Sequence, residues 1–154
     1  MELKQYIGLV GQEIGISKWF EIDQERINRF ADVTEDWQFI HVDLIRAADT
    51  PFGRTVAHGF LTLSLIGAMG KDCLPAVAGR VMGVNYGFDR IRFVTPVKSG
   101  QRVRGRFRLM DVAERNSKEY LVKFNVSIEI DGSDKPAVMA DWLAIFYFSD
   151  PPPL

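Results

Sequence analysis

The feature that most constrains the fold is a helical pattern over residues 59–74 that is apolar on almost every face. Its apolar side chains are Phe60, Leu61, Leu63, Leu65, Ile66, Ala68 and Met69. A helix without a polar face is typically buried on all sides, because no part of its surface favours water. The rest of the chain must therefore supply the elements that surround this helix.

The chain that follows the helical segment has the pattern of β-strands. Strands are expected over Val81–Phe93, Gln101–Val112, Glu119–Ile130 and Val138–Phe148, with turn signals between them. In the third segment, apolar residues at every second position from Tyr120 to Ile130 indicate a half-buried antiparallel strand. We expect the four strands to form a meander. The predicted fold class is α+β, with a long central helix wrapped by a curved antiparallel β-sheet.

The N-terminal part of the chain predicts smaller elements. Ile14, Ile16, Phe20 and Ile22 alternate with other residues, which indicates a strand at the edge of the sheet. Asp23 is a suitable N-cap for a short helix that ends near Val33. Residues 34–57 mix polar, aromatic and turn residues. A loop of this length is usually functional or carries a short helix of its own.

Length, charge and cysteine content exclude several classes of protein. With 154 residues, the chain is predicted to be a single domain over residues 1–154. The net charge of −1 supplies no global field for nucleic acid or an anionic membrane. One cysteine excludes an internal disulfide and is compatible with a reducing compartment. The longest apolar stretch is too short to span a bilayer, and the N-terminus lacks a signal-peptide pattern. We expect a soluble, cytoplasmic protein with no nucleic-acid or membrane partner.

Two features suggest chemistry but have simpler interpretations. Arg102, Arg104, Arg106 and Arg108 alternate with inward-facing residues on one predicted strand. A solvated outer strand face explains them better than a nucleic-acid site, because the overall charge is nearly neutral. Cys73 has no histidine beside it in the sequence, and we interpret it as a small core residue rather than a nucleophile.

The most informative segment is the polar and aromatic loop from Thr34 to His41. It contains Asp36 and one of only two histidines in the chain, His41. A carboxylate and an imidazole together can bind a water molecule and remove its proton, because histidine titrates near neutral pH. Alone, this pair is also compatible with a structural hydrogen bond.

The second histidine, His58, directly precedes Gly59 at the start of the apolar helix. Unpaired N–H groups and the positive end of the helix dipole meet at such a position, where they can polarise a carbonyl group. Glycine also lets a substrate approach the backbone closely. Two alternatives remain open at this point. His58 and Gly59 can be a core histidine and a glycine cap, and Asp36, His41 and His58 can form a metal-binding triad.

These motifs together resemble the MaoC-like, (R)-specific enoyl-CoA hydratases of the hot-dog fold, especially the nodulation protein N-like branch. The family motif is roughly G-D-x-N-P-x-H, and the segment E-D-W-Q-F-I-H keeps its Asp and His at the same spacing. Glu35, Gln38 and Phe39 depart from the broad pattern. Further similarity lies in P-F-G at residues 51–53, A-H-G-F-L-T-L-S at 57–64, N-Y-G at 85–87, R-F at 92–93 and P-V at 96–97.

The resemblance implies a homodimer that binds an acyl thioester near its subunit interface. Asp36 and His41 would activate the water that adds to a trans-2-enoyl-CoA to give an (R)-3-hydroxyacyl-CoA, and the Gly59 N–H would polarise the thioester carbonyl. Ser64 would line the site and orient the carboxylate. Asn85 and Arg92 would contact the pantetheine or phosphate groups of CoA. The CoA thioester is the substrate, and neither a further cofactor nor a metal is expected.

Other functions on the same fold remain open from the sequence. One alternative is a different hot-dog acyl-thioester enzyme, such as a thioesterase or a dehydratase acting on an acyl carrier. Another is a non-catalytic module that binds acyl thioesters. The presence of both Asp36 and His41 argues against the non-catalytic module, because binding alone does not require a water-activating pair.

Overall fold

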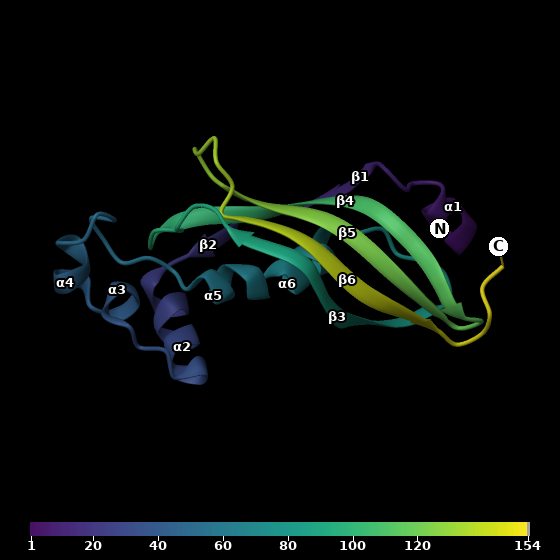
Figure 1. The fold of residues 1–154 in the computed structure, drawn as a ribbon, viewed down its shortest axis with the longest axis horizontal. Helices are drawn as coiled ribbons and strands as arrows, with labels where there is room; N and C mark the ends of the chain where they lie inside the picture. The colour runs from purple at the N-terminus through teal and green to yellow at the C-terminus, as the bar shows by residue number, and fades with distance from the viewer. Residues whose placement is uncertain (154) are drawn as a thin grey trace.

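The strands predicted after the apolar helix form most of the sheet in the computed structural model, which describes residues 1–153. They are β3 (Arg80–Phe93), β4 (Gln101–Asn116), β5 (Glu119–Ile130) and β6 (Val138–Phe148). The bounds of β5 and β6 are those predicted, whereas β4 continues beyond Val112 and leaves Ser117 and Lys118 as the turn to β5. The strands make a curved antiparallel sheet (Figure 1).

The strand order is β1-β4-β5-β6-β3. Strands β4, β5 and β6 form a meander as predicted, but the expected meander of four strands is wrong because β3 pairs with β6. The free edge of β4 is already occupied by β1 (Glu13–Ile16) and β2 (Phe20–Ile22), so β3 cannot pair there. These two short strands replace the single N-terminal strand that was expected, and β1 lies at the sheet edge as predicted.

The apolar helical segment forms two consecutive helices instead of one, α5 (Gly59–Ser64) and α6 (Ile66–Cys73). Leu65 separates them because its N–H donates to Thr62 O, three residues back, at 3.3 Å. The backbone of Leu65 nevertheless stays in the right-handed helical region, at φ −72° and ψ −10°. The two helices therefore follow one another along one face of the sheet (Figure 1).

The core lies between these helices and the inner face of the sheet. Phe107 and Phe124 are fully buried, and the Phe124 ring stacks on Trp142 with a centroid distance of 5.2 Å. Gly105 allows α6 to approach β4 closely, because an added Cβ would lie 3.1 Å from Met69 Sδ. The alternation predicted for β5 is confirmed, since Tyr120, Val122 and the apolar residues at every second position to Ile130 are buried.

The prediction that the helical segment is buried on all sides is wrong. Leu61, Ile66 and Met69 are buried against the rest of the chain, but Phe60 is 66% exposed, and Gly67 and Ala68 are also exposed. Strand β3 exposes apolar side chains as well, namely Val81, Met82, Val84, Tyr86 and Phe93. Nothing within residues 1–153 covers these groups, so the apolar pattern of the helix exceeds what its own chain buries.

The three helices between residues 24 and 48 gather at one end of the sheet (Figure 1). Helix α2 (Gln24–Thr34) begins as predicted, with the Asp23 carboxylate accepting the Arg26 N–H at 2.8 Å. The long loop after it carries two short helices, α3 (Phe39–Val42) and α4 (Leu44–Ala48). The sequence patterns gave no signal for α1 (Leu3–Ile7), whose Leu3 and Tyr6 are fully buried. Among residues 1–153, no helix is long and apolar enough to cross a membrane.

The arginines of β4 lie on the outer face of the sheet, as predicted. Arg104 pairs with Glu129 at 2.6 Å, Arg106 pairs with Glu13 at 2.9 Å, and Arg102 pairs with Asp131. Because each of these three cations has a carboxylate partner on a neighbouring segment, cross-strand ion pairing explains the three arginines.

Candidate active site

Asp36 is placed by an unusual turn at the end of α2. Glu35 caps this helix in the left-handed conformation, with φ 59° and ψ 28°, and is the one non-glycine residue with positive φ among residues 1–153. The Asp36 N–H then donates to Ala31 O at 3.1 Å, which fixes the start of the next segment. The Asp36 carboxylate remains solvent-exposed, and its Oδ1 accepts the Gln38 N–H at 3.3 Å.

His41 is buried in α3 and has a defined tautomer. Its Nδ1 lies 2.6 Å from the main-chain oxygen of Val56, which can only accept, so Nδ1 carries the hydrogen. The neutral ring therefore presents the lone pair of Nε2. Burial lowers the pKa of His41 and the neighbouring His58 lowers it further, whereas the hydrogen bond to Val56 and the charge of Asp36 act in the opposite direction. His41 is thus a base that stays unprotonated to lower pH than an ordinary histidine.

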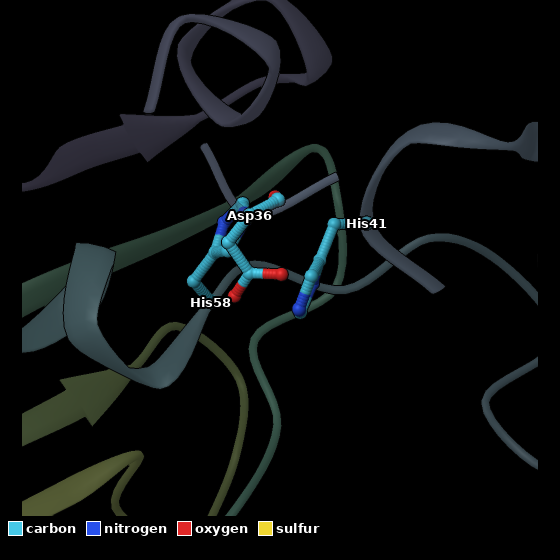
Figure 2. A group of neighbouring side chains, drawn as sticks. All are labelled: Asp36, His41 and His58. Atoms are coloured by element: carbon cyan, nitrogen blue, oxygen red, sulfur yellow. The ribbon is translucent and has the colours of Figure 1, made fainter. Parts of the chain in front are cut away.

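Asp36, His41 and His58 come together although they are distant in the sequence. One side-chain nitrogen or oxygen atom from each residue lies within 4.8 Å of the other two. One carboxylate oxygen of Asp36 points toward the ring of His41 (Figure 2). The carboxylate and the imidazole can therefore hold one water molecule between them.

The relation of the two histidine rings disfavours the metal-triad alternative. His41 and His58 stack with a centroid distance of 3.8 Å and an interplanar angle of 24°. An imidazole lone pair lies in the plane of its ring, so stacked rings do not direct their nitrogens to one point, as ligands of a common metal must. The geometry suits proton transfer by one of the two rings.

His41 and Gly59 line the same cavity, which has a volume of about 230 Å³. Most of its other lining residues are apolar, among them Ile40, Phe52, Val56, Phe93 and Val97. Gly59 is the first residue of α5, so its N–H has no acceptor within the helix. The cavity thus combines an apolar wall, a base and a main-chain donor, which suits an acyl group with a polarisable carbonyl.

Three further residues named by the resemblance lie apart from this group. The Ser64 hydroxyl donates to Phe60 O at 2.6 Å. Asn85 accepts the Trp142 Nε1–H at 3.1 Å and lines a second cavity of about 490 Å³, together with Arg80. Arg92 is exposed and donates to Ile91 O at 2.9 Å. One chain therefore brings Asp36 close to His41 and places His41 and Gly59 in one cavity. Ser64, Asn85 and Arg92 belong to neither group.

Gln24 is a supporting residue that the sequence did not indicate. Its Nε2 donates to His41 O at 2.7 Å, and its Oε1 accepts the Thr55 hydroxyl at 2.5 Å. It therefore ties the segment that carries His41 to the segment that ends at Val56. A glutamine after a helix N-cap has no distinctive pattern, so only the tertiary contacts reveal this role. Cys73, by contrast, stays a core residue, since burial raises the pKa of its thiol to about 11.

The substitution Gly59→Ala is expected to reduce activity through Phe93. The new Cβ would lie 2.8 Å from Cδ1 of Phe93, so the ring must move within the cavity that both residues line. Displacement of a bound acyl group by about 1 Å can cost ~10²-fold in rate. Steady-state kinetics of Gly59→Ala should show this loss, and the double variant with Phe93→Leu should recover part of it. Full activity of Gly59→Ala would contradict the close approach.

Comparison with known proteins agrees with the fold and identifies the family. The family described as MaoC like domain matches residues 7–129. Nodulation protein N of Rhizobium meliloti is 50% identical over 150 residues, which cover 97% of this chain and 93% of that protein. The 3-hydroxyacyl-thioester dehydratase Z of Mycobacterium tuberculosis is 41% identical over 131 residues, covering 85% of this chain and 86% of that protein.

A solved structure extends the likeness to three dimensions. The (R)-hydratase from A. caviae superimposes with a TM-score of 0.71 at 25% identity, covering 88% of this chain and 94% of that one. The superposition places the antiparallel sheet and its helices in the hot-dog fold, as the sequence predicted. Since the family match also spans most of its length, the chain belongs to the family of MaoC-like domains.

Proposed function

We propose that this protein is an (R)-specific enoyl-CoA hydratase, which adds water to a trans-2-enoyl-CoA and catalyses the reverse dehydration. The observation that carries the proposal is the free Nε2 of His41, beside the Asp36 carboxylate and in the same cavity as Gly59. The names of the dehydratase from M. tuberculosis and the hydratase from A. caviae support the same class of reaction.

In the proposed reaction, Asp36 and His41 hold the attacking water. His41 Nε2 takes one proton as the water oxygen forms a bond to C3 of the enoyl group. The electrons of the C2–C3 double bond then move toward the thioester carbonyl, whose developing negative charge the Gly59 N–H stabilises. The proton returns from His41 to C2 as this enolate collapses. The product contains one added water molecule, and His41 is again neutral.

The direct test is to incubate the purified protein with crotonyl-CoA and follow the loss of absorbance of the conjugated thioester. Chiral analysis of the product should give the (R)-3-hydroxyacyl-CoA. A folded protein that leaves enoyl-CoA substrates of several chain lengths unchanged would refute the proposal. Release of free CoA thiol would instead identify a thioesterase, and activity restricted to an acyl-carrier substrate would identify the carrier-dependent dehydratase.

The protein is further proposed to act as a homodimer. One edge of β3 is unpaired within residues 1–153, and Val84 and Tyr86 on this strand are 44% and 57% exposed. Phe60 and Phe93 add apolar surface next to the cavity, and the centroids of their rings lie 5.6 Å apart. A second copy would bury an apolar surface that water otherwise disfavours. It would also cover the side of the cavity at Phe93.

The substitution Val84→Asp tests this association, because it places a charge within the proposed interface. Light scattering after gel filtration should change from a dimer to a monomer of 17.5 kDa, with loss of hydratase activity. Val33→Asp is the matched control, since Val33 on α2 is 79% exposed and lies outside the proposed interface. A wild-type protein that is monomeric and fully active would contradict the homodimer.

A further inference from the structure

His58 contacts both members of the water-activating pair and is itself only 3% exposed. Its Nε2–H donates to the main-chain oxygen of Asp36 at 2.9 Å. Its ring stacks on the His41 ring with a centroid distance of 3.8 Å, and the centroid of the Phe30 ring, on α2, lies 5.0 Å away. The His58 ring is therefore packed between the His41 ring and Phe30 of α2.

His58 also sets the start of α5. Its main-chain oxygen accepts the N–H groups of Leu61 and Thr62 at 3.0 and 3.3 Å. Gly59, the next residue in the chain, is the proposed donor to the thioester carbonyl. His58 thus connects Asp36, the His41 ring and the Gly59 N–H. It is nevertheless absent from the lining of the cavity.

The polar atoms of His58 agree with a supporting role. Nε2 is occupied by the hydrogen bond to Asp36, and Nδ1 is buried without a hydrogen-bond partner among residues 1–153. Both nitrogens are therefore withheld from the cavity. A group that touches no substrate but contacts the reacting residues acts through their geometry.

We propose that His58 is a positioning residue, which holds the Asp36 main chain through its Nε2–H and orients the His41 ring by stacking. The proposal rests on the hydratase function, and it assigns two separable contacts to one side chain. Loss of either contact should lower kcat and leave KM nearly unchanged, because His58 does not line the cavity that would hold the substrate.

Two variants separate these contacts. His58→Gln keeps an N–H donor that can reach Asp36 O but removes the ring, whereas His58→Phe keeps a stacking ring but removes the donor. Each should lower kcat by about ten- to a hundredfold, since small misplacements of reacting groups have effects of this size. Ser17→Ala is the control, because Ser17 is buried and accepts the Gly105 N–H at 3.0 Å, away from the site. It should lower the melting temperature without changing kcat.

NMR titration of the His41 imidazole provides a readout that does not depend on activity. In both His58 variants the ring signals of His41 should shift and titrate at a different pH from those of the wild type. Wild-type kcat and unchanged His41 signals in both variants would overturn the positioning role. A wild-type protein without hydratase activity would refute the proposed function instead, while the NMR titration would still show whether His58 orients His41.

Discussion

Replacing Asp36 by Asn is expected to lower kcat for crotonyl-CoA hydration by about 10²–10⁴-fold, the usual contribution of a positioned acid–base group. The amide has nearly the same shape as the carboxylate but carries no charge and offers an N–H group on one side. The amide can no longer accept hydrogen bonds through two oxygen atoms, and it carries no charge that could stabilise a protonated His41. Because the cavity itself is unchanged, KM should stay close to the wild-type value. Steady-state kinetics with the conjugated thioester measure both quantities.

A second aspartate in the same region supplies the control for this substitution. Asp43 caps α4 by accepting the N–H groups of Ile45 and Arg46 at 3.1 and 3.0 Å. Asparagine caps helices about as well as aspartate, so Asp43→Asn should retain both stability and activity. An Asp36→Asn protein with the wild-type kcat would remove Asp36 from the mechanism. Equal losses in both variants would point to a general effect of charge in this region.

Sequence patterns are local, and this explains both the correct and the incorrect parts of the fold prediction. Alternation in β5 and the apolar helical pattern are local signals, and they predicted a sheet with a helix against it. The position of β3 depends on which sheet edge is already occupied by β1 and β2, and this is decided by tertiary structure. The apolar pattern likewise indicates that Phe60 avoids water, but it cannot distinguish burial within the chain from burial by a second copy.

In the candidate site, too, the sequence indicates residues that lie in one local motif, whereas tertiary contacts reveal the others. Asp36 and His41 can be proposed from the sequence because they keep the spacing of the family motif within one short segment. Glu35 departs from the glycine of the family motif, and the structure shows what that position requires, namely a left-handed backbone at φ 59°. Glycine adopts this conformation without steric cost, whereas glutamate does so less readily. Gln24 and His58 support the site through main-chain oxygens, and such contacts leave no signature in the sequence of either partner.

Replacing His41 by Ala is expected to lower kcat by about 10²–10⁴-fold, because it removes the proposed general base. It also leaves the buried main-chain oxygen of Val56 without its donor, which should cost about 1–3 kcal/mol of stability. Chemical denaturation therefore has to accompany the kinetics. A folded His41→Ala protein that hydrates crotonyl-CoA at the wild-type rate would contradict the role of His41.

The lowered pKa of His41 also predicts how the activity and the stability of the protein depend on pH. The midpoint of the acid limb of the wild-type kcat/KM should lie below pH 6.5, the ordinary pKa of histidine, because His41 becomes protonated only at lower pH. Between the folded and unfolded pKa values of His41 the unfolded chain binds more protons, so the contribution of His41 to the free energy of unfolding is fully present above pH 6.5 and is lost as the pH falls through this window. His41→Ala should lose that part of the pH dependence. An acid limb at or above pH 6.5 in the wild type would mean that another group supplies the base.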